Sequence, residues 1–96
     1  MTTSAEITTR DNPDAGRFEI LAGEEVAGFA DYSVTDGVAT MPHTVVEKAY
    51  DGQGLGSKLA VFALDTLRER GLKVRPTCPF IKGYIDRHDA YADLVA

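Results

Sequence analysis

The first half of the chain alternates between apolar and polar residues. In the segment 17–22 (RFEILA), Phe18, Ile20 and Ala22 fall on one side of an extended chain. This period of two is typical of a strand with one buried face. Runs of a similar kind follow over 26–34 and 38–46, with a shorter one over 5–9. The pattern therefore predicts an antiparallel meander.

Two local signals shape the last of these strands. Asp36 and Gly37 stand between the runs 26–34 and 38–46, and an Asp-Gly pair suits a hairpin turn with positive φ at both central residues. Pro42 lies inside the run 38–46. Because proline has no N–H to donate to a neighbouring strand, we expect a bulge or a local loss of pairing at this residue.

The hydrophobic period changes after residue 54. Apolar residues now recur at the three- and four-residue spacing of an amphipathic helix. They are Leu55, Leu59, Phe62, Ala63 and Leu67. Gly71 suits the position just beyond the end of such a helix, and basic residues before it favour the negative end of the helix dipole. The pattern predicts a helix that ends before Gly71.

The remaining segments complete a mixed fold. A strand over 72–78 and a helix from Pro79 to His88 give the order β-β-β-α-β-α. Because a helical crossover returns the chain parallel to the strand before it, 72–78 is expected beside 38–46. The predicted class is α+β, an antiparallel meander continued by a βαβ unit, with a mixed sheet packed with helices. We expect one small domain over 1–96, with residues 1–4 disordered.

Composition and charge narrow the class of protein. The chain has 96 residues, 44% of them hydrophobic and 26% charged, as in an ordinary soluble domain. Its net charge of −5 argues against a nucleic-acid partner. No apolar run approaches the ~20 residues of a membrane span, and the N-terminus lacks the pattern of a signal peptide. We therefore expect a cytoplasmic protein with neither a nucleic-acid nor a membrane partner.

The charge is unevenly distributed, and metal chemistry is not indicated. Residues 1–50 hold three basic and nine acidic residues, whereas 51–96 hold seven basic and six acidic ones. An anionic ligand is therefore expected to prefer the second half. Cys78 is the single cysteine, and His43 and His88 are the two histidines. These three residues do not supply the ligand set of a zinc site.

The stretch DGQGLGSK, residues 51–58, is the clearest candidate for a ligand site. Gly52, Gly54 and Gly56 precede a predicted helix, where unpaired N–H groups and the helix dipole favour an anion. Ser57 adds a hydroxyl and Lys58 a positive charge. The spacing fits neither a Walker loop nor a dinucleotide fingerprint. From the glycines alone, a phosphate cradle and a flexible entry into a helix both remain open.

These residues also carry a resemblance to a known family. The segment HTVVEKAYDGQGLGSKLAVFAL resembles the acetyl-CoA loop of the GCN5-related N-acetyltransferase superfamily, in which [Q/R]-x-x-G-x-[G/A] opens the central helix. Gly54 and Gly56 match the two small positions. Together with TCPFIKGYI and the short length, this segment resembles the minimal group of the superfamily. That group is the YjdJ-type, or N-acetyltransferase domain-containing protein 1-like, group. The resemblance covers roughly residues 5–95.

The resemblance implies a small acetyl-CoA-dependent acyltransferase whose acceptor is an amine of a small molecule or a peptide. It implies that Val46 offers main-chain groups to the thioester. It also implies a loop around the pyrophosphate made of Asp51, Gly52, Gln53, Gly54, Leu55, Gly56, Ser57 and Lys58. The first motif position, usually Gln or Arg, is Asp51 here, and an acid beside a pyrophosphate repels it. The helices that form much of the acceptor site in larger members have no room in this chain, so the acceptor pocket is expected to be open.

Three residues are candidates for catalysis. Cys78 precedes a helix, where a thiolate is favoured; it is a candidate acetyl carrier or proton donor, or else an inert buried thiol. His43 next to Pro42 is a candidate to relay a proton or activate Cys78, or else it packs in the sheet. Tyr84 is a candidate to protonate the sulfur of CoA, or else it is a core aromatic paired with Phe80. His88 is expected to face solvent. The alternative function is a non-catalytic CoA- or acyl-CoA-binding module or an interaction domain.

Overall fold

The structure is a computed structural model that describes residues 6–96. Strands and helices follow one another along the chain as β1 (Ile7–Asn12), β2 (Arg17–Ala22), β3 (Glu25–Thr35), β4 (Val38–Val46), η1 (Lys48–Tyr50), α1 (Leu55–Glu69), β5 (Lys73–Arg75), α2 (Pro79–Asp86) and η2 (Asp89–Leu94). The predicted α+β class is confirmed. The expectation that residues 1–4 are disordered lies outside the described residues.

The five strands form one mixed sheet in the order β1-β2-β3-β4-β5. The first four strands pair antiparallel with their neighbours, as the meander predicts. β5 pairs parallel with β4 after the chain crosses over through α1. The short strand expected over 5–9 is β1, which extends further, to Asn12.

Both local predictions for β4 are confirmed. The turn before it has φ of 52° at Asp36 and 78° at Gly37, the positive values that a tight hairpin requires. Further along, the pairs Asp31↔His43 and Ser33↔Thr40 enclose two steps on β3 but three on β4. The extra residue on β4 is a bulge next to Pro42.

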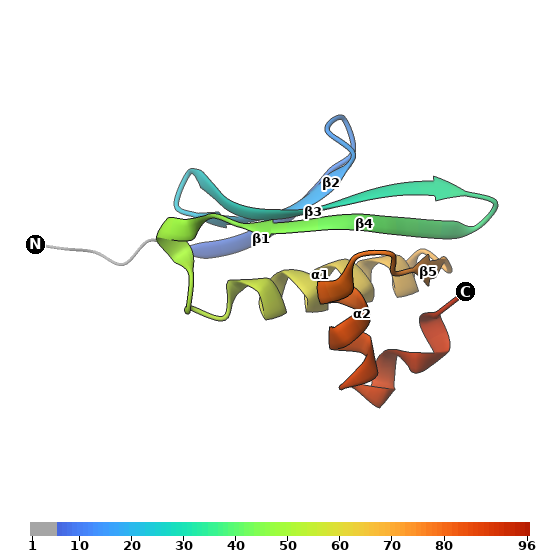
Figure 1. Cartoon of the computed structure of the whole chain (residues 1–96). Helices are drawn as coiled ribbons and strands as arrows, with labels where there is room; N and C mark the ends of the chain where they lie inside the picture. Colours follow the sequence, from blue (N-terminus) through green and yellow to red (C-terminus); the bar gives the residue numbers. More distant parts are fainter. Residues whose placement is uncertain (1–5) are drawn as a thin grey trace, which may run out of the picture.

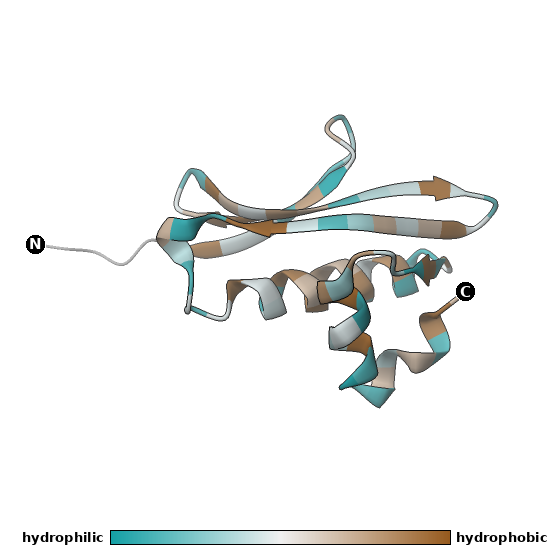
Figure 2. Ribbon diagram, viewed as in Figure 1, coloured by the Kyte–Doolittle hydropathy of each residue, from teal (hydrophilic) through white to brown (hydrophobic). Residues whose placement is uncertain are grey.

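The core lies between one face of the sheet and the helices. Phe18 and Ile20 of β2 and Met41 of β4 are fully buried there, against Leu59 and Leu64 of α1. Figure 1 shows α1 and α2 on the same side of the strands. Figure 2 shows hydrophobic residues along β4, α1 and α2, which contribute to this layer. In the part of the chain that the structure describes, no helix covers the opposite face of the sheet.

Two predicted elements are shorter than expected. β5 covers 73–75 in place of 72–78, because Pro76 cannot donate a ladder hydrogen bond. α2 covers 79–86 in place of 79–88, and η2 follows it almost at once. α1 ends as predicted, with Gly71 at φ of 72° just beyond it. No helix among residues 6–96 is both long enough and apolar enough to cross a membrane.

Candidate functional site

The glycine loop between β4 and α1 presents a run of unpaired backbone donors. Gly54 precedes α1 with φ of 73°, and Gly52 has φ of 79°, values that favour glycine. The first hydrogen bond of α1 runs from the N–H of Lys58 to the carbonyl oxygen of Gly54, at 3.3 Å. Within the described chain, the N–H groups of residues 52–57 have no hydrogen-bond acceptor. Such a run of donors at a helix N-terminus favours an anion.

A groove of about 220 Å³ opens beside these donors. It joins the end of β4, the glycine loop and the first turn of α2, and it is lined by Val46, Tyr50, Asp51, Gly52, Gly54, Leu55, Gly56, Ser57 and Phe80. Gly56 lies directly against Phe80, since a Cβ added at Gly56 would lie 2.9 Å from Cζ of that ring. The absence of a side chain at Gly56 therefore lets α2 approach the loop.

A larger hollow, of about 620 Å³, lies on the other side of α1, next to β1. Val61 and Phe62 form its apolar part, and Asp65 and Glu69 line it as well. It shares only Ser57 with the first groove. Because the larger hollow touches neither the end of β4 nor the glycines, the smaller groove is the better candidate site.

The outer edge of β4 is free beside this groove. β5 pairs only with residues 38–40 of β4, and the next residue, Met41, accepts a hydrogen bond from Cys78. Among the described residues, no strand pairs with this edge from Pro42 to Val46. The N–H of Glu47 bonds to Ala27 O at 2.7 Å, which makes the preceding pair Gly28↔Val46 a non-hydrogen-bonded one. The N–H and C=O of Val46 therefore point away from β3, toward the opening between β4 and β5.

Cys78 lies at the inner end of that opening. Its N–H bonds to Met41 O at 2.9 Å, and its thiol donates a hydrogen bond to Oγ1 of Thr44, at 3.4 Å. The residue is 4% exposed and directly precedes Pro79, the first residue of α2. The structure thus places Cys78 two residues before Phe80 of the groove, on the same side of the sheet as Thr44.

The other two catalytic candidates lie elsewhere. Tyr84 is buried in the core, with its ring stacked on His88 at 3.9 Å, and it does not line the groove. His43 is exposed and pairs with Asp31. Since side chains alternate along a strand, and Thr44 faces Cys78, His43 points to the opposite, helix-free face. The structure therefore does not bring His43 or Tyr84 to Cys78.

Tyr50 holds the glycine loop to the sheet. Its hydroxyl donates a hydrogen bond to Oε1 of Glu25, at 2.6 Å. The pKa of Tyr50 is raised above its ordinary value, chiefly because this hydrogen bond to a carboxylate favours the neutral phenol. The bond links η1 to the start of β3, so the loop is anchored two residues before its first glycine, Gly52. His88 is exposed as expected, with Nδ1 2.7 Å from Tyr84 O.

Sequence reasoning missed three residues of this region. Phe80 follows the predicted start of a helix, where an apolar residue is ordinary and gives no sign of a ligand site. Thr44 and Tyr50 have no motif of their own. Two tertiary features bring these three residues to the site. β4 continues beyond its short pairing with β5, and α2 packs on Gly56. The spacing Gly56 to Phe80 offers no local signal for such a contact.

Comparisons with known proteins agree with this geometry. The model of a family described as GCN5-related N-acetyl-transferase matches residues 17–94. A mixed sheet in which β4 continues beyond its short pairing with β5, with a helix N-terminus beside that free edge, defines a small acetyltransferase-type fold. The chain belongs to the GCN5-related N-acetyltransferase family, and the predicted resemblance is confirmed.

Individual relatives span different shares of the chain. Protein NATD1 of Gallus gallus is 40% identical over 48 residues, half of this chain and 44% of that protein. Protein NATD1 of Homo sapiens gives the same identity over 42% of its length. The match therefore spans less than half the length of these curated relatives.

Solved structures extend the likeness to the whole chain. A GCN5-like putative N-acetyltransferase from Staphylococcus aureus is 27% identical, with a TM-score of 0.70 over 99% of this chain and 91% of that one. The ribosomal-protein-S18-alanine N-acetyltransferase from Escherichia coli is 25% identical, with a TM-score of 0.62 over 74% of this chain and 49% of that one. The minimal acyl-CoA N-acyltransferase fold predicted from the sequence is confirmed.

Proposed function

We propose that this protein transfers an acetyl group from acetyl-CoA to an amine, with a cytoplasmic setting. The observation that carries the proposal is the run of unpaired N–H groups over 52–57 beside a groove that ends at Val46. A ligand with an anionic middle and a long thin arm fits a site with donors at one end and a free strand edge at the other. Family membership supports the same chemistry.

The residues present fit a pyrophosphate at the loop. Consecutive backbone N–H groups suit its oxygens, and the space beside two of the glycines is open, since nothing lies within 4 Å of a Cβ built on Gly52 or Gly54. Lys58 is exposed in the first turn of α1. Asp51 also lines the groove and opposes binding by its charge. The site is therefore suited to an anion, with one residue that weakens it.

The free edge of β4 suits the thioester end of acetyl-CoA. Acetyl-CoA supplies a thioester whose carbonyl carbon is open to attack by a neutral amine. The N–H of Val46 is aimed to donate to the carbonyl oxygen, where negative charge develops. The new C–N bond forms as the C–S bond breaks, and the amine gives up a proton while the sulfur takes one.

Cys78 is our first candidate for the proton delivered to sulfur, or for a transient acetyl carrier. Its thiol lies between Thr44 and the first turn of α2, at the inner end of the opening that starts at Val46. Tyr84 remains a candidate for the same proton, from a position further along α2. His43, on the helix-free face, is a candidate to take the proton from the amine if the acceptor approaches from that face.

Binding is tested first, by titrating the ¹⁵N-labelled protein with CoA. We expect saturable shifts of the amide resonances of residues 52–57 and of Val46, with no change at the Asp36–Gly37 turn. Millimolar CoA that leaves the loop resonances unmoved would overturn acetyl transfer and CoA binding together. Cys78 is tested by mass spectrometry after incubation with acetyl-CoA, and a Cys78→Ala variant with full transfer activity would exclude a covalent role.

A non-catalytic CoA-binding module is the second candidate. It is favoured by Asp51 at the rim of the groove and by the helix-free face, where no described element encloses an acceptor. The two functions separate in a transfer assay with polyamines, amino acids and peptides as acceptors. Release of free CoA that depends on one class of amine supports the enzyme. CoA binding without release, across all classes, supports the module.

A further inference from the structure

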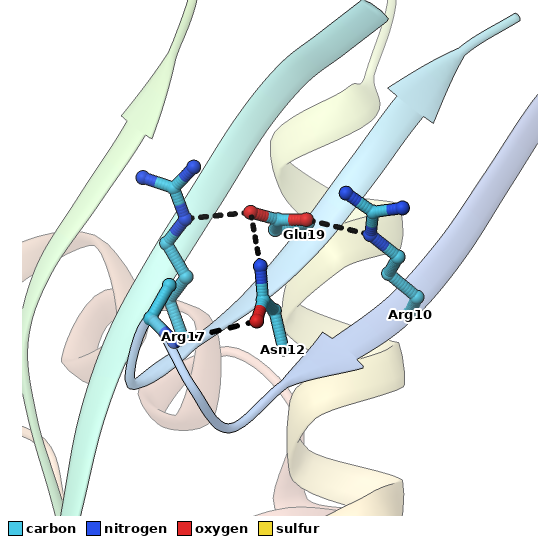
Figure 3. A network of polar contacts seen from close by, with 5 residues as sticks. Arg10, Asn12, Arg17 and Glu19 are labelled. Carbon is cyan, nitrogen blue, oxygen red and sulfur yellow. Dashed lines mark hydrogen bonds and ion pairs between the residues drawn. The ribbon is translucent and has the colours of Figure 1, made fainter. Parts of the chain in front are cut away.

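An ion cluster occupies the helix-free face of the sheet, away from the groove. Glu19 of β2 is only 1% exposed although no described helix covers this face. Its carboxylate accepts hydrogen bonds from Nε of Arg10 and Nε of Arg17, both at 2.7 Å, and from Nδ2 of Asn12 at 3.3 Å (Figure 3). These three side chains cover the acid. Their hydrogen bonds offset the free-energy cost of burying its charge.

The cluster leaves both arginines with unused donors. Each guanidinium bonds to Glu19 through Nε alone, so both terminal amino groups of Arg10 and Arg17 lack a partner among the described residues. Figure 3 shows these amino groups directed away from Glu19, on either side of it. The guanidinium of Arg17 also lies over the ring of Phe29, at 4.4 Å from its centre. Contacts on two sides therefore hold it in place before any ligand binds.

The arginine side chains of this face suit a carboxylate. Arg10, Arg17 and Glu19 together carry one net positive charge, and the arginine fork matches the two oxygens of a carboxylate. Asp31 lies opposite Arg17 on β3 without forming an ion pair with it. With Asp31 counted, the charged side chains of this face sum to zero, so the second charge of a phosphate dianion adds desolvation cost without added attraction, and a carboxylate is favoured.

We propose that Arg10 and Arg17, held by Glu19, bind the carboxylate of a small molecule on the helix-free face. The site is distinct from the groove beside the glycine loop. It is made by β1 and β2, whereas the groove is made by β4, α1 and α2. This carboxylate site does not depend on acetyl transfer.

The register of β2, β3 and β4 indicates which other chemical group the bound molecule has. Arg17 pairs with Asp31, and Asp31 pairs with His43, so the three side chains form one row across the helix-free face. Neighbouring strands lie about 4.8 Å apart, which puts Arg17 and His43 about 10 Å apart along this row. A ligand with its carboxylate on Arg17 then offers an amine to Asp31 and His43. Its identity as the acceptor, an amine that also bears a carboxylate, rests on the proposed function.

Direct binding tests the site without acetyl-CoA. The Nε–H resonances of Arg10 and Arg17 are followed by NMR during titration with acetate and, separately, with inorganic phosphate. We expect saturable shifts with acetate at lower concentration than with phosphate. Arg17→Lys keeps the charge but loses the fork, and should weaken acetate binding by about tenfold. Arg75→Lys, at an exposed arginine outside the cluster, should leave it unchanged.

Two outcomes overturn the proposal, and a third separates it from the proposed function. Equal shifts at Arg75 and at the cluster would mean an adventitious ion only, and tighter binding of phosphate would refute the carboxylate assignment. Thermal melting of Arg17→Lys checks that the fold is kept, and Arg10→Lys provides a second variant if it is not. Loss of acetate binding in either folded variant, with transfer to amines lacking a carboxylate unchanged, would separate this site from the proposed function.

Discussion

At the scale of single residues, Asp51 is the feature most at odds with an anion site. It lines the groove and is exposed next to the unpaired amides. In water, a unit charge about 4 Å away contributes about 1 kcal/mol. We therefore expect Asp51→Asn to tighten CoA binding by about fivefold, and Asp51→Arg to tighten it further. Isothermal titration at low ionic strength measures both dissociation constants.

A matched variant separates local charge from net charge. Asp36→Asn removes the same charge at the β3–β4 turn, at the far end of the sheet from the loop (Figure 1), and asparagine tolerates the positive φ there. Its affinity for CoA should stay at the wild-type value. If Asp36→Asn and Asp51→Asn tighten CoA equally, the effect is one of overall charge and the loop is not the site.

The buried acid Glu19 links stability to pH. Burial alone would raise the pKa of its carboxyl, but hydrogen bonds from Arg10, Arg17 and Asn12 outweigh burial and hold the pKa below the ordinary value of 4.5. Such a group stabilises the fold above its unfolded pKa, and this contribution is lost as the pH falls through the folded pKa. We expect the free energy of unfolding to decrease as the pH drops below 4.5.

A substitution isolates this contribution. Glu19→Gln should cost about 1–3 kcal/mol at neutral pH, because two charged hydrogen bonds are weakened. Its free energy of unfolding should then vary less with pH in the acid range than that of the wild type. Urea denaturation at several pH values measures both curves, with Glu24→Gln, an exposed acid in the β2–β3 turn, as the control. Parallel curves for Glu19→Gln and wild type would contradict the assignment.

At the scale of elements, the sequence predicts what local chemistry determines. The bounds of β4, the Asp36–Gly37 turn and the end of α1 at Gly71 all follow from patterns that a few neighbouring residues create. The glycines of 51–58 lead into α1 as the pattern predicts, because glycines and a helix start are local signals. Whether CoA binds there is still a prediction.

Long-range features could not be predicted in the same way. The face to which His43 points depends on the register with β3 across the bulge. Pro42 predicts that a bulge forms, but not which residues lie on each side of it. The alternation in RFEILA places Glu19 opposite the core, but only pairing with β1 brings Arg10 and Asn12 over it. Burial of a charged residue on a helix-free face is therefore a property of the assembled sheet.

Gly28 lies at a close approach between β3 and β4. A Cβ there would lie 2.7 Å from Val45 O and 3.3 Å from Ile20 Cγ2. Since the nearest atom belongs to the backbone of β4, the strand that ends at the groove would have to move. We expect Gly28→Ala to lower the free energy of unfolding by about 1–3 kcal/mol and to shift the amide resonance of Val46.

The same methyl group at another glycine serves as the control. Gly83 lies within α2, and a Cβ there would meet only the mobile end of Arg87, at 3.3 Å. Because alanine favours a helix over glycine by about 1 kcal/mol, Gly83→Ala should be neutral or stabilising in the same urea experiment. A destabilisation equal to that of Gly28→Ala would show that the close approach of β3 and β4 is not the cause.

At the scale of the whole molecule, one core joins the sheet to every helical segment. η2 is tied to α1 by the hydrogen bond of Tyr91 to Asp65 at 2.8 Å and by the ion pair of Arg68 with Asp93 at 3.0 Å. Val95 also bridges to Val74 of β5. With the helices of the described chain on one face only, this layer contains nearly all of its buried apolar residues. We therefore expect the last residues to contribute to stability as central ones do.

Leu94 tests this dependence. It is 4% exposed in the core, whereas its neighbour Val95 is 43% exposed. We expect Leu94→Ala to destabilise the protein by about 2–5 kcal/mol, as truncation of a buried leucine does, and Val95→Ala by less than about 0.5 kcal/mol. Urea denaturation followed by circular dichroism and by tyrosine fluorescence should give one coincident transition for both variants, because η2, α1 and the sheet share a single core. A Leu94→Ala variant as stable as Val95→Ala, or two separate transitions, would mean that η2 packs on the core without contributing to its stability.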